Sequence, residues 1–227
     1  MESNSPFRKR KQSDIFLQTE GDNWFARNQQ ALSSSINTVS TDLIINRIGK
    51  FKPTISSILE VGCANAIKLE FLTTFFEAKA FGVDPSIAAI SDARDRFSGK
   101  GIPNEFWVGE SSVIPLKDDS IDLVFLGFFL YLIPSQDLHI TLTEINRVLK
   151  PGGFLAVEDF DPGGKYSKPY AHHQDVVTYK DEYSRYFTNE YKYFLLEKIS
   201  YSHSSDTFDL DADERLSTQL FYKPKTT

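Results

Sequence analysis

Three acidic residues stand at or near the ends of successive strands that the sequence predicts. They are Glu60, Asp84 and Glu110, in or directly after the apolar runs 56–61, 80–84 and 105–109. In an open parallel sheet the carboxyl ends of the strands meet at one edge, where ligands bind. Carboxylates at that edge accept hydrogen bonds from hydroxyl and amino groups. The spacing therefore predicts a crevice that binds a nucleotide cofactor.

A turn of small residues follows the first of these strands, because residues 62–66 read Gly-Cys-Ala-Asn-Ala. Small side chains let a ligand approach the main-chain N–H groups of the helix that follows, for which Asn65 is the expected N-cap. A pyrophosphate-binding turn requires G-x-G-x-x-G, and only Gly62 of that pattern is present. The turn therefore predicts a cofactor other than NAD.

Two of the acidic positions can be interpreted in more than one way. Asp84 precedes Pro85 and Ser86, where an aspartate often caps a helix, but it also lies one strand-helix unit after the turn. That position favours hydrogen bonds to the ribose hydroxyls of an adenosyl cofactor. Glu110, with Ser111 beside it, could face an adenine amino group or belong to a solvated loop, and the sequence leaves both open.

Strands and helices alternate along the centre of the chain. The sequence predicts a helix over 28–50, then strands over 56–61, 80–84, 105–109, 121–127 and 154–160, and helices over 65–77, 86–97 and 135–149. Two further strands are expected over 193–202 and 215–222, joined by an acidic loop. This order predicts an α/β fold of the Rossmann-like kind: an open, mostly parallel sheet with helices on both faces and an antiparallel hairpin at its C-terminal edge.

Length and charge limit the functional classes. A chain of 227 residues suits one domain, and its net charge of −6 gives no uniform basic field for a nucleic acid. The single cysteine, Cys63, fits a reducing compartment, and no apolar run has the length of a membrane span or a signal peptide. We expect a cytoplasmic protein that binds neither nucleic acid nor membrane, with residues 1–12 as a solvated, frayed end.

Five segments together resemble the class I S-adenosylmethionine-dependent methyltransferases, namely residues 58–66, 81–86, 109–116, 119–125 and 149–153. The resemblance covers about residues 55–160 and implies S-adenosyl-L-methionine as the cofactor. It implies that the methionine part is held near Glu60, Gly62, Cys63 and Ala64, the ribose by Asp84 beside Pro85, and adenine near Glu110 and Ser111, with Leu126 in the floor of the crevice. The family turn is closer to G-C-G-x-G. Alanine is tolerated at residues 64 and 66 as long as φ stays negative.

Outside this core, residues 20–28, 159–162, 179–181 and 213–215 resemble a bacterial group of methyltransferases encoded with surface-sugar and nonulosonic-acid pathways. In that group the segment before the first helix covers the cofactor. The resemblance makes Trp24, Phe25, Arg27 and Asn28 candidates for a lid. Alternatively, Trp24 and Phe25 staple the first helix to the sheet.

The expected organisation is one domain over 1–227: a lid and helix (1–50), a cofactor-binding core (55–160), a substrate-side insertion (161–191) and C-terminal strands (192–227). The insertion is rich in tyrosine, histidine and aspartate, which predicts a small polar acceptor, a sugar or sugar-like metabolite, for the methyl group. His172, His173 and Asp161 are the candidate catalytic residues, because a histidine titrates in the range a general base needs. No metal site is expected. The alternative function is a non-catalytic S-adenosylmethionine-binding protein that acts through a partner.

Overall fold

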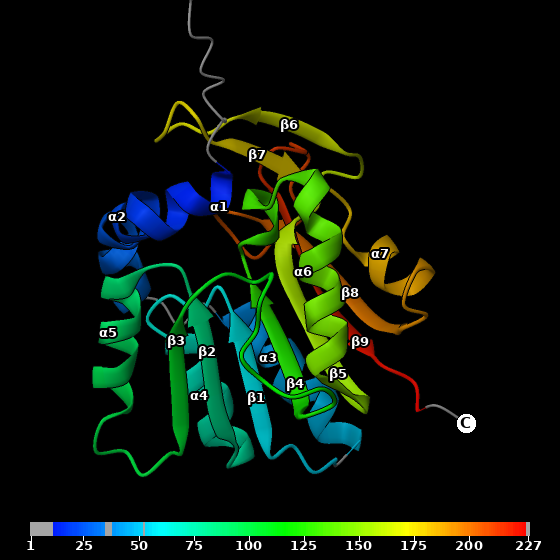
Figure 1. The fold of residues 1–227 in the computed structure, drawn as a ribbon. Coiled ribbons are helices and arrows are strands. Elements are labelled where there is room, and N and C mark those ends of the chain that lie inside the picture. The colour runs from blue at the N-terminus through cyan, green and yellow to red at the C-terminus, as the bar shows by residue number, and fades with distance from the viewer. Residues whose placement is uncertain (1–10, 35–37, 52, 226–227) are drawn as a thin grey trace, which may run out of the picture.

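A seven-stranded sheet forms the centre of the molecule in the computed structural model, which describes residues 11–34, 38–51 and 53–225. Its strand order is β3-β2-β1-β4-β5-β9-β8. The strands are β1 (Ser57–Val61), β2 (Lys79–Asp84), β3 (Asn104–Val108), β4 (Ile121–Gly127), β5 (Leu149–Phe160), β8 (Phe194–Ser202) and β9 (Arg215–Tyr222). The first five pair in parallel, whereas β9 and β8 are antiparallel (Figure 1). The predicted Rossmann-like sheet with its antiparallel edge hairpin is confirmed.

The helices and a small second sheet surround this core. They are α1 (Gln12–Ile15), the π-helix η1 (Phe16–Glu20), α2 (Gly21–Ser34), α3 (Thr38–Phe51), α4 (Ile67–Phe76), α5 (Ile87–Phe97), the 3₁₀ helix η2 (Leu130–Leu132), α6 (Ser135–Val148), α7 (Ser184–Asn189), and the hairpin of β6 (Tyr166–Pro169) and β7 (Val177–Lys180). One helix was predicted over 28–50. The structure instead has α2 and α3 there, and residues 35–37 lie outside the described residues.

Each face of the sheet carries its own hydrophobic cluster, because successive strand side chains point to opposite faces. On one face Ile44 of α3, Leu69 of α4 and Ile90 of α5 pack together with Ile58 of β1. On the other face the apolar side of α6 and Phe187 of α7 pack against strands β1, β4 and β5. On α6, Leu138, Leu142 and Ile145 are buried, whereas Leu149, predicted as the end of that helix, is buried as the first residue of β5.

Strand β5, which follows α6, begins at Leu149, whereas the sequence predicted a strand from residue 154. Leu149 already pairs with Ile121, and the register then shifts so that Phe154 pairs with Leu123. Residues 150–153 form the irregularity between these pairs, and Gly152 there has a φ of +86°. The pattern Pro-Gly-Gly therefore marks a bulge within β5 rather than a turn before it.

Above the carboxyl ends of the parallel strands, the N-terminal helices meet the β6–β7 hairpin (Figure 1). The Gln12 side chain makes this contact. Its Nε2 donates to the carbonyls of Leu132 in η2 (2.6 Å) and Val177 in β7 (3.0 Å), and its Oε1 accepts from the Val177 N–H (3.0 Å). The expectation of a solvated end through residue 12 is wrong for Gln12, which is buried. Residues 1–10 lie outside the described residues.

Candidate functional site

The turn after β1 has a left-handed backbone at three positions. The φ angles are +71° at Gly62, +43° at Ala64 and +56° at Ala66. The condition of negative φ at the two alanines therefore does not hold. A side chain in the left-handed region costs roughly 1–2 kcal/mol per residue because Cβ approaches the following carbonyl oxygen. The turn is thus strained at both places where alanine replaces glycine.

Helix α4 is capped by Glu60 rather than by Asn65. The N-cap position is Ala66, whose side chain offers no hydrogen bond, and the Glu60 carboxyl instead accepts from the main-chain N–H of Leu69. Both polar atoms of the Asn65 side chain are buried and without a hydrogen-bond partner among the described residues. The left-handed turn carries the chain past Asn65 before the helix starts, which is why the predicted cap does not form.

Glu60 also belongs to a buried group of charges with Lys68 and Glu158. Burial raises the pKa of Glu60 to about 8, with Lys68 opposing and Glu158 adding to the rise. Burial acts on Glu158 as well, but contact with the Lys68 ammonium and hydrogen bonds from Tyr201 and Ser40 hold its pKa below the usual range. One carboxyl of the pair is therefore ionised at neutral pH, and the other keeps its proton.

Asp84 joins the ends of β1 and β2. Its Oδ2 accepts a 2.9 Å hydrogen bond from the Ala64 N–H, and its Oδ1 accepts one of 2.8 Å from the Ser86 N–H. Burial raises the pKa of Asp84 to about 6, although these two hydrogen bonds oppose the shift. Each carboxylate oxygen has a second lone pair. Asp84 can therefore hold the turn and still accept hydrogen bonds from a ligand.

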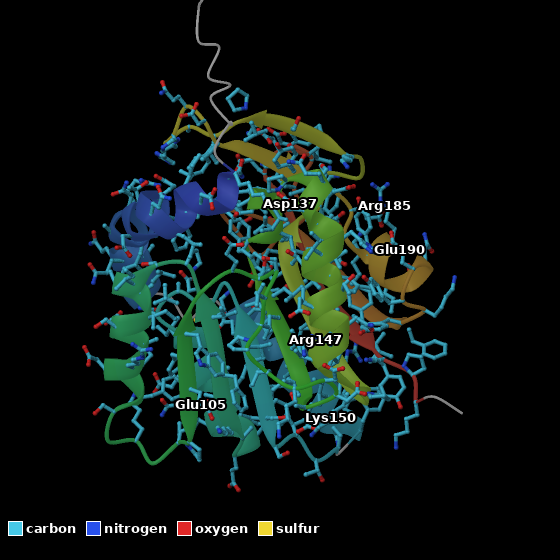
Figure 2. The ribbon with its side chains drawn as sticks, viewed as in Figure 1. Glu105, Asp137, Arg147, Lys150, Arg185 and Glu190 are labelled. Atoms are coloured by element: carbon cyan, nitrogen blue, oxygen red, sulfur yellow. The ribbon has the colours of Figure 1, made fainter. Side chains whose placement is uncertain are left out.

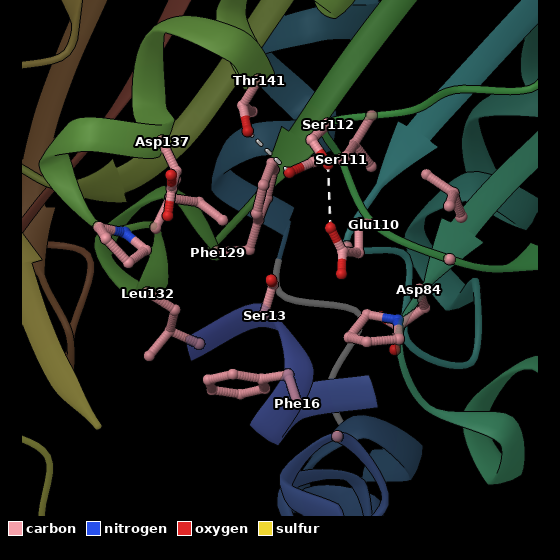
Figure 3. Close-up of a pocket in the computed structure, with 18 of the residues that line it drawn as sticks. Ser13, Phe16, Asp84, Glu110, Ser111, Ser112, Phe129, Leu132, Asp137 and Thr141 are labelled. Atoms are coloured by element: carbon pink, nitrogen blue, oxygen red, sulfur yellow. Dashed lines mark hydrogen bonds between the residues drawn. The ribbon is translucent and has the colours of Figure 1, made fainter. Parts of the chain in front are cut away.

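The segment after β3 brings Glu110 and two serines to the same place. Ser112 Oγ donates to Glu110 Oε2 at 3.0 Å, and the Ser111 hydroxyl lies 2.9 Å from the hydroxyl of Thr141 on α6 (Figure 3). The second contact joins the β3 loop to α6. Glu110 retains lone pairs that no residue of the described chain uses.

A pocket opens where these segments converge (Figure 3). Of the predicted cofactor residues, those that line it are Trp24, Gly62, Asp84, Pro85, Glu110 and Ser111. Lining residues that the sequence did not single out include Ser13, Phe16, Ile133, Asp137 and Thr141. No local pattern in the sequence marked these residues, because they come from α1, from η1, from the segment between η2 and α6, and from α6 itself, which only the tertiary fold brings to the strand ends.

Other predicted cofactor residues lie around the pocket rather than in its wall. Glu60, Cys63, Ala64 and Leu126 are buried beneath it. On α2, Arg27 contacts Glu20 and donates to the Tyr170 hydroxyl (3.1 Å), and the Asn28 amide donates to the Trp24 carbonyl (2.8 Å). These two residues therefore contact η1, the segment before β7 and Trp24, but not the pocket itself.

Trp24 itself faces inward. It lines the pocket, and its indole N–H, the only donor of that ring, hydrogen-bonds the Tyr131 hydroxyl. Phe16 of η1 lines the pocket as well. The N-terminal helices therefore contribute part of the pocket wall, and we call this part the cover. That it acts as a lid on the cofactor stays a prediction.

The three candidate catalytic residues do not line the pocket. His172 and His173 lie in the turn between β6 and β7, where His172 is exposed and the His173 Nδ1 accepts from the Asp175 N–H (3.2 Å). Asp161 is buried and forms an ion pair with Lys198 of β8 at 2.7 Å. The tip of the hairpin is exposed to solvent, and Asp161 follows the end of β5, on the far side of β4 from β1, so neither feature brings these groups into the pocket lining. Their catalytic role stays a prediction without geometric support.

Residues 59–157 match the family described as a methyltransferase domain. This segment contains the strained turn, Asp84 and Glu110. The chain contains a class I S-adenosylmethionine-dependent methyltransferase domain.

Among curated relatives of this domain, a fatty-acid O-methyltransferase of Mycolicibacterium smegmatis is 34% identical over 106 residues, which are 46% of this chain and 37% of that protein. A demethylmenaquinone methyltransferase of Lactiplantibacillus plantarum is 29% identical over 130 residues, 49% of this chain and 54% of the relative. The matched segments thus span about half or less of the length of these relatives.

Solved structures show that the likeness of fold extends further. A 1,6-didemethyltoxoflavin-N1-methyltransferase of Burkholderia thailandensis, with S-adenosylhomocysteine bound, has a TM-score of 0.73 at 11% identity and covers 93% of this chain and 89% of its own. The N-methyltransferase NodS of Bradyrhizobium japonicum has a TM-score of 0.65 at 17% identity, covering 94% and 97%. At these identities the likeness concerns the fold alone.

None of the helices in residues 11–34, 38–51 and 53–225 has the length and hydropathy that a bilayer crossing requires. Within the same residues, no three His, Cys, Asp or Glu side chains are placed to share a metal ion.

Proposed function

We propose that this chain transfers the methyl group of S-adenosylmethionine to a small-molecule acceptor. The observation that carries the proposal is the convergence of Gly62, Asp84 and Glu110, from the segments after three neighbouring strands, on one pocket within a methyltransferase domain. A single domain that includes the N-terminal cover is part of the proposal, because Gln12 and Trp24 bond directly to the segments around that pocket.

The proposed roles follow from the polar groups that line the pocket. Asp84 accepts hydrogen bonds from the ribose hydroxyls with the lone pairs that Ala64 and Ser86 leave free. Glu110 accepts from the adenine amino group, and Ser111 lies beside the ring. Gly62 presents no side chain, so the methionine part can lie against the main chain of the turn. S-adenosylmethionine supplies an electrophilic methyl group on a sulfonium sulfur.

The remaining contribution of the protein is to position the acceptor and exclude water. Methyl transfer is an in-line displacement, so a fixed approach of the two reacting atoms lowers the barrier. The cover formed by Phe16 and Trp24 over the pocket supports this function, because aromatic side chains there exclude solvent from the reacting atoms.

The class of acceptor is also a proposal. A small molecule rather than a nucleic acid fits the net charge of −6. The sugar prediction rested on the polar residues of 161–191, and the pocket lining contains no residue of that segment. A sugar acceptor and a cytoplasmic location therefore stay predictions from the sequence, and the oligomeric state is left open.

Two measurements test the proposal. Calorimetric titration with S-adenosylhomocysteine checks the cofactor site, and incubation with methyl-labelled S-adenosylmethionine and a cell lysate, followed by separation into small-molecule, RNA and protein fractions, checks the reaction. We expect binding and label in the small-molecule fraction. Binding without any transfer would favour the non-catalytic alternative, whereas label confined to RNA or protein would refute a small-molecule acceptor.

A further inference from the structure

The polar side chains that line the pocket divide into two groups. Most have partners within the chain: Asp84, Glu110, Ser111, Ser112, Thr141 and Trp24. By contrast, the side chains of Lys11, Ser13 and Asp137 have no hydrogen bond or ion pair within residues 11–34, 38–51 and 53–225. All three nevertheless line the same pocket. The polar atoms of these three side chains are therefore fully available to a ligand, whereas those of the other group are available only in part.

The location of Asp137 separates it from the proposed cofactor residues. Figure 3 shows Asp137 and Leu132 on one side of the pocket and Asp84 and Glu110 on the other, with Phe129 between them. Asp137 lies at the pocket end of α6, whereas Arg147, with its salt bridges to Glu144 and Asp118, lies toward the opposite end (Figure 2). The pocket therefore has a second end, with its own polar groups, beyond the residues assigned to the adenosyl part.

The walls of this second end are mainly apolar, with Phe16, Leu132, Ile133 and Pro134 among the lining residues. Asp137 is in the first turn of α6, where a negative charge stabilises the helix dipole, and this alone explains an aspartate at that position. It does not explain a carboxylate that lines an apolar pocket. A ligand that covers Asp137 must supply a donor or a positive charge, because an ionised carboxyl removed from water without a partner is strongly disfavoured.

We propose that this end is the acceptor subsite, and that it selects a small ring compound carrying a protonated or N–H nitrogen, with Asp137 on the nitrogen and the apolar walls on the ring. The inference rests on the proposed methyltransferase function. An anionic acceptor is disfavoured because Asp137 and Glu110 both line the pocket. Lys11 also lines it, but that side chain is exposed, where solvent screens its charge.

Three probes of similar shape test this selection: phenethylamine, phenylethanol and phenylacetate, each titrated by NMR into the full chain saturated with S-adenosylhomocysteine. We expect phenethylamine to bind about tenfold more tightly than the neutral alcohol, as a charge-assisted hydrogen bond provides, and phenylacetate to bind weakest. Asp137→Asn should remove the preference for the amine and leave S-adenosylhomocysteine affinity unchanged. Asp95→Asn, on the exposed side of α5, is the matched control and should change neither property.

Equal binding of the three probes, a preference for phenylacetate, or an amine preference that survives Asp137→Asn would each overturn the subsite. No detectable binding of any probe at millimolar concentration, with S-adenosylhomocysteine bound normally, would do the same. Failure of S-adenosylhomocysteine itself to bind would instead contradict the proposed function, so the two failures are distinguishable in one sample.

Discussion

The Asp84 carboxylate accepts a 2.9 Å hydrogen bond from the main-chain N–H of Ala64, which ties the end of β2 to the turn after β1. The residue proposed to bind the ribose therefore also fixes the backbone on which the methionine part would lie. Disturbing one half of the proposed cofactor site should disturb the other.

Replacing Asp84 with alanine should weaken binding of S-adenosylhomocysteine by about 1.5–3 kcal/mol, the range for hydrogen bonds to a charged group. The loss combines the ribose contacts with loosening of the turn. Calorimetry measures the change, with circular dichroism as the check on folding and Asp95→Asn as the control. Unchanged affinity in a folded Asp84→Ala protein would show that the site assignment is wrong.

Cofactor affinity should fall as the pH decreases below about 6. Burial raises the pKa of Asp84 to about 6 in the free protein, so the acceptor form of the carboxyl predominates above that pH and is lost below it. The decrease approaches tenfold per pH unit if binding requires the ionised form. Titrations with S-adenosylhomocysteine between pH 5 and 8 test this, and Asp84→Asn should flatten the profile. A flat profile in the unmodified chain would contradict it.

A comparison of alanine variants at Gly62 and Gly99 separates the effect of backbone strain from the effect of a new side-chain contact. Both have positive φ, +71° and +74°, but a Cβ on Gly62 would lie 3.0 Å from Phe129, whereas a Cβ on Gly99 meets nothing within 4 Å. Each alanine variant should lose about 1–2 kcal/mol of unfolding free energy from the left-handed backbone. Only Gly62→Ala should also displace Phe129 and weaken S-adenosylhomocysteine binding. Equal effects of the two variants on binding would remove the special role of Gly62.

Restoring glycine in the turn should stabilise the protein. Ala64→Gly and Ala66→Gly each relieve left-handed strain, partly offset by the greater entropy of glycine in the unfolded chain, for a net gain of about 0.5–1 kcal/mol. Chemical denaturation measures the gain. Ala93→Gly, inside α5, serves as the opposite case and should destabilise by a similar amount. Destabilisation by both turn variants would mean that φ there is not strained.

The hydrogen bonds of Gln12 should hold the cover, the N-terminal part of the pocket wall, in place. Gln12→Ala removes three hydrogen bonds, to Leu132 and to both main-chain groups of Val177. We expect faster hydrogen exchange in residues 11–20 and faster release of S-adenosylhomocysteine, with a smaller change in global stability, because the segment is short and peripheral. Gln12→Glu keeps the acceptor for the Val177 N–H but places a buried carboxylate oxygen against the Leu132 and Val177 carbonyl oxygens, so it should disturb the cover at least as much as Gln12→Ala. Exchange that stays slow in Gln12→Ala would show that other contacts hold the cover.

The arrangement of the strands around which the pocket forms follows from the sequence alone. Alternating apolar runs and helical stripes predict the parallel sheet, since hydrophobic periodicity is local, and strands β2 and β4 end at Asp84 and Gly127 as predicted. Because parallel strands place their carboxyl ends at one edge, the positions of Glu60, Asp84 and Glu110 follow from the element order alone.

The rest of the pocket depends on contacts between residues that are far apart in the chain. The φ angles at Ala64 and Ala66 depend on how the turn meets Asp84 and α4, and no local pattern contains that contact. The partners of Gln12 lie 120 and 165 residues away, so its burial has no signature nearby in the chain. His172 and His173 had a suitable chemistry, but the β6–β7 hairpin carries them away from the pocket lining, whereas Asp137 of α6 is brought into it. Residue type sets what a side chain can do, and long-range packing decides which side chains meet.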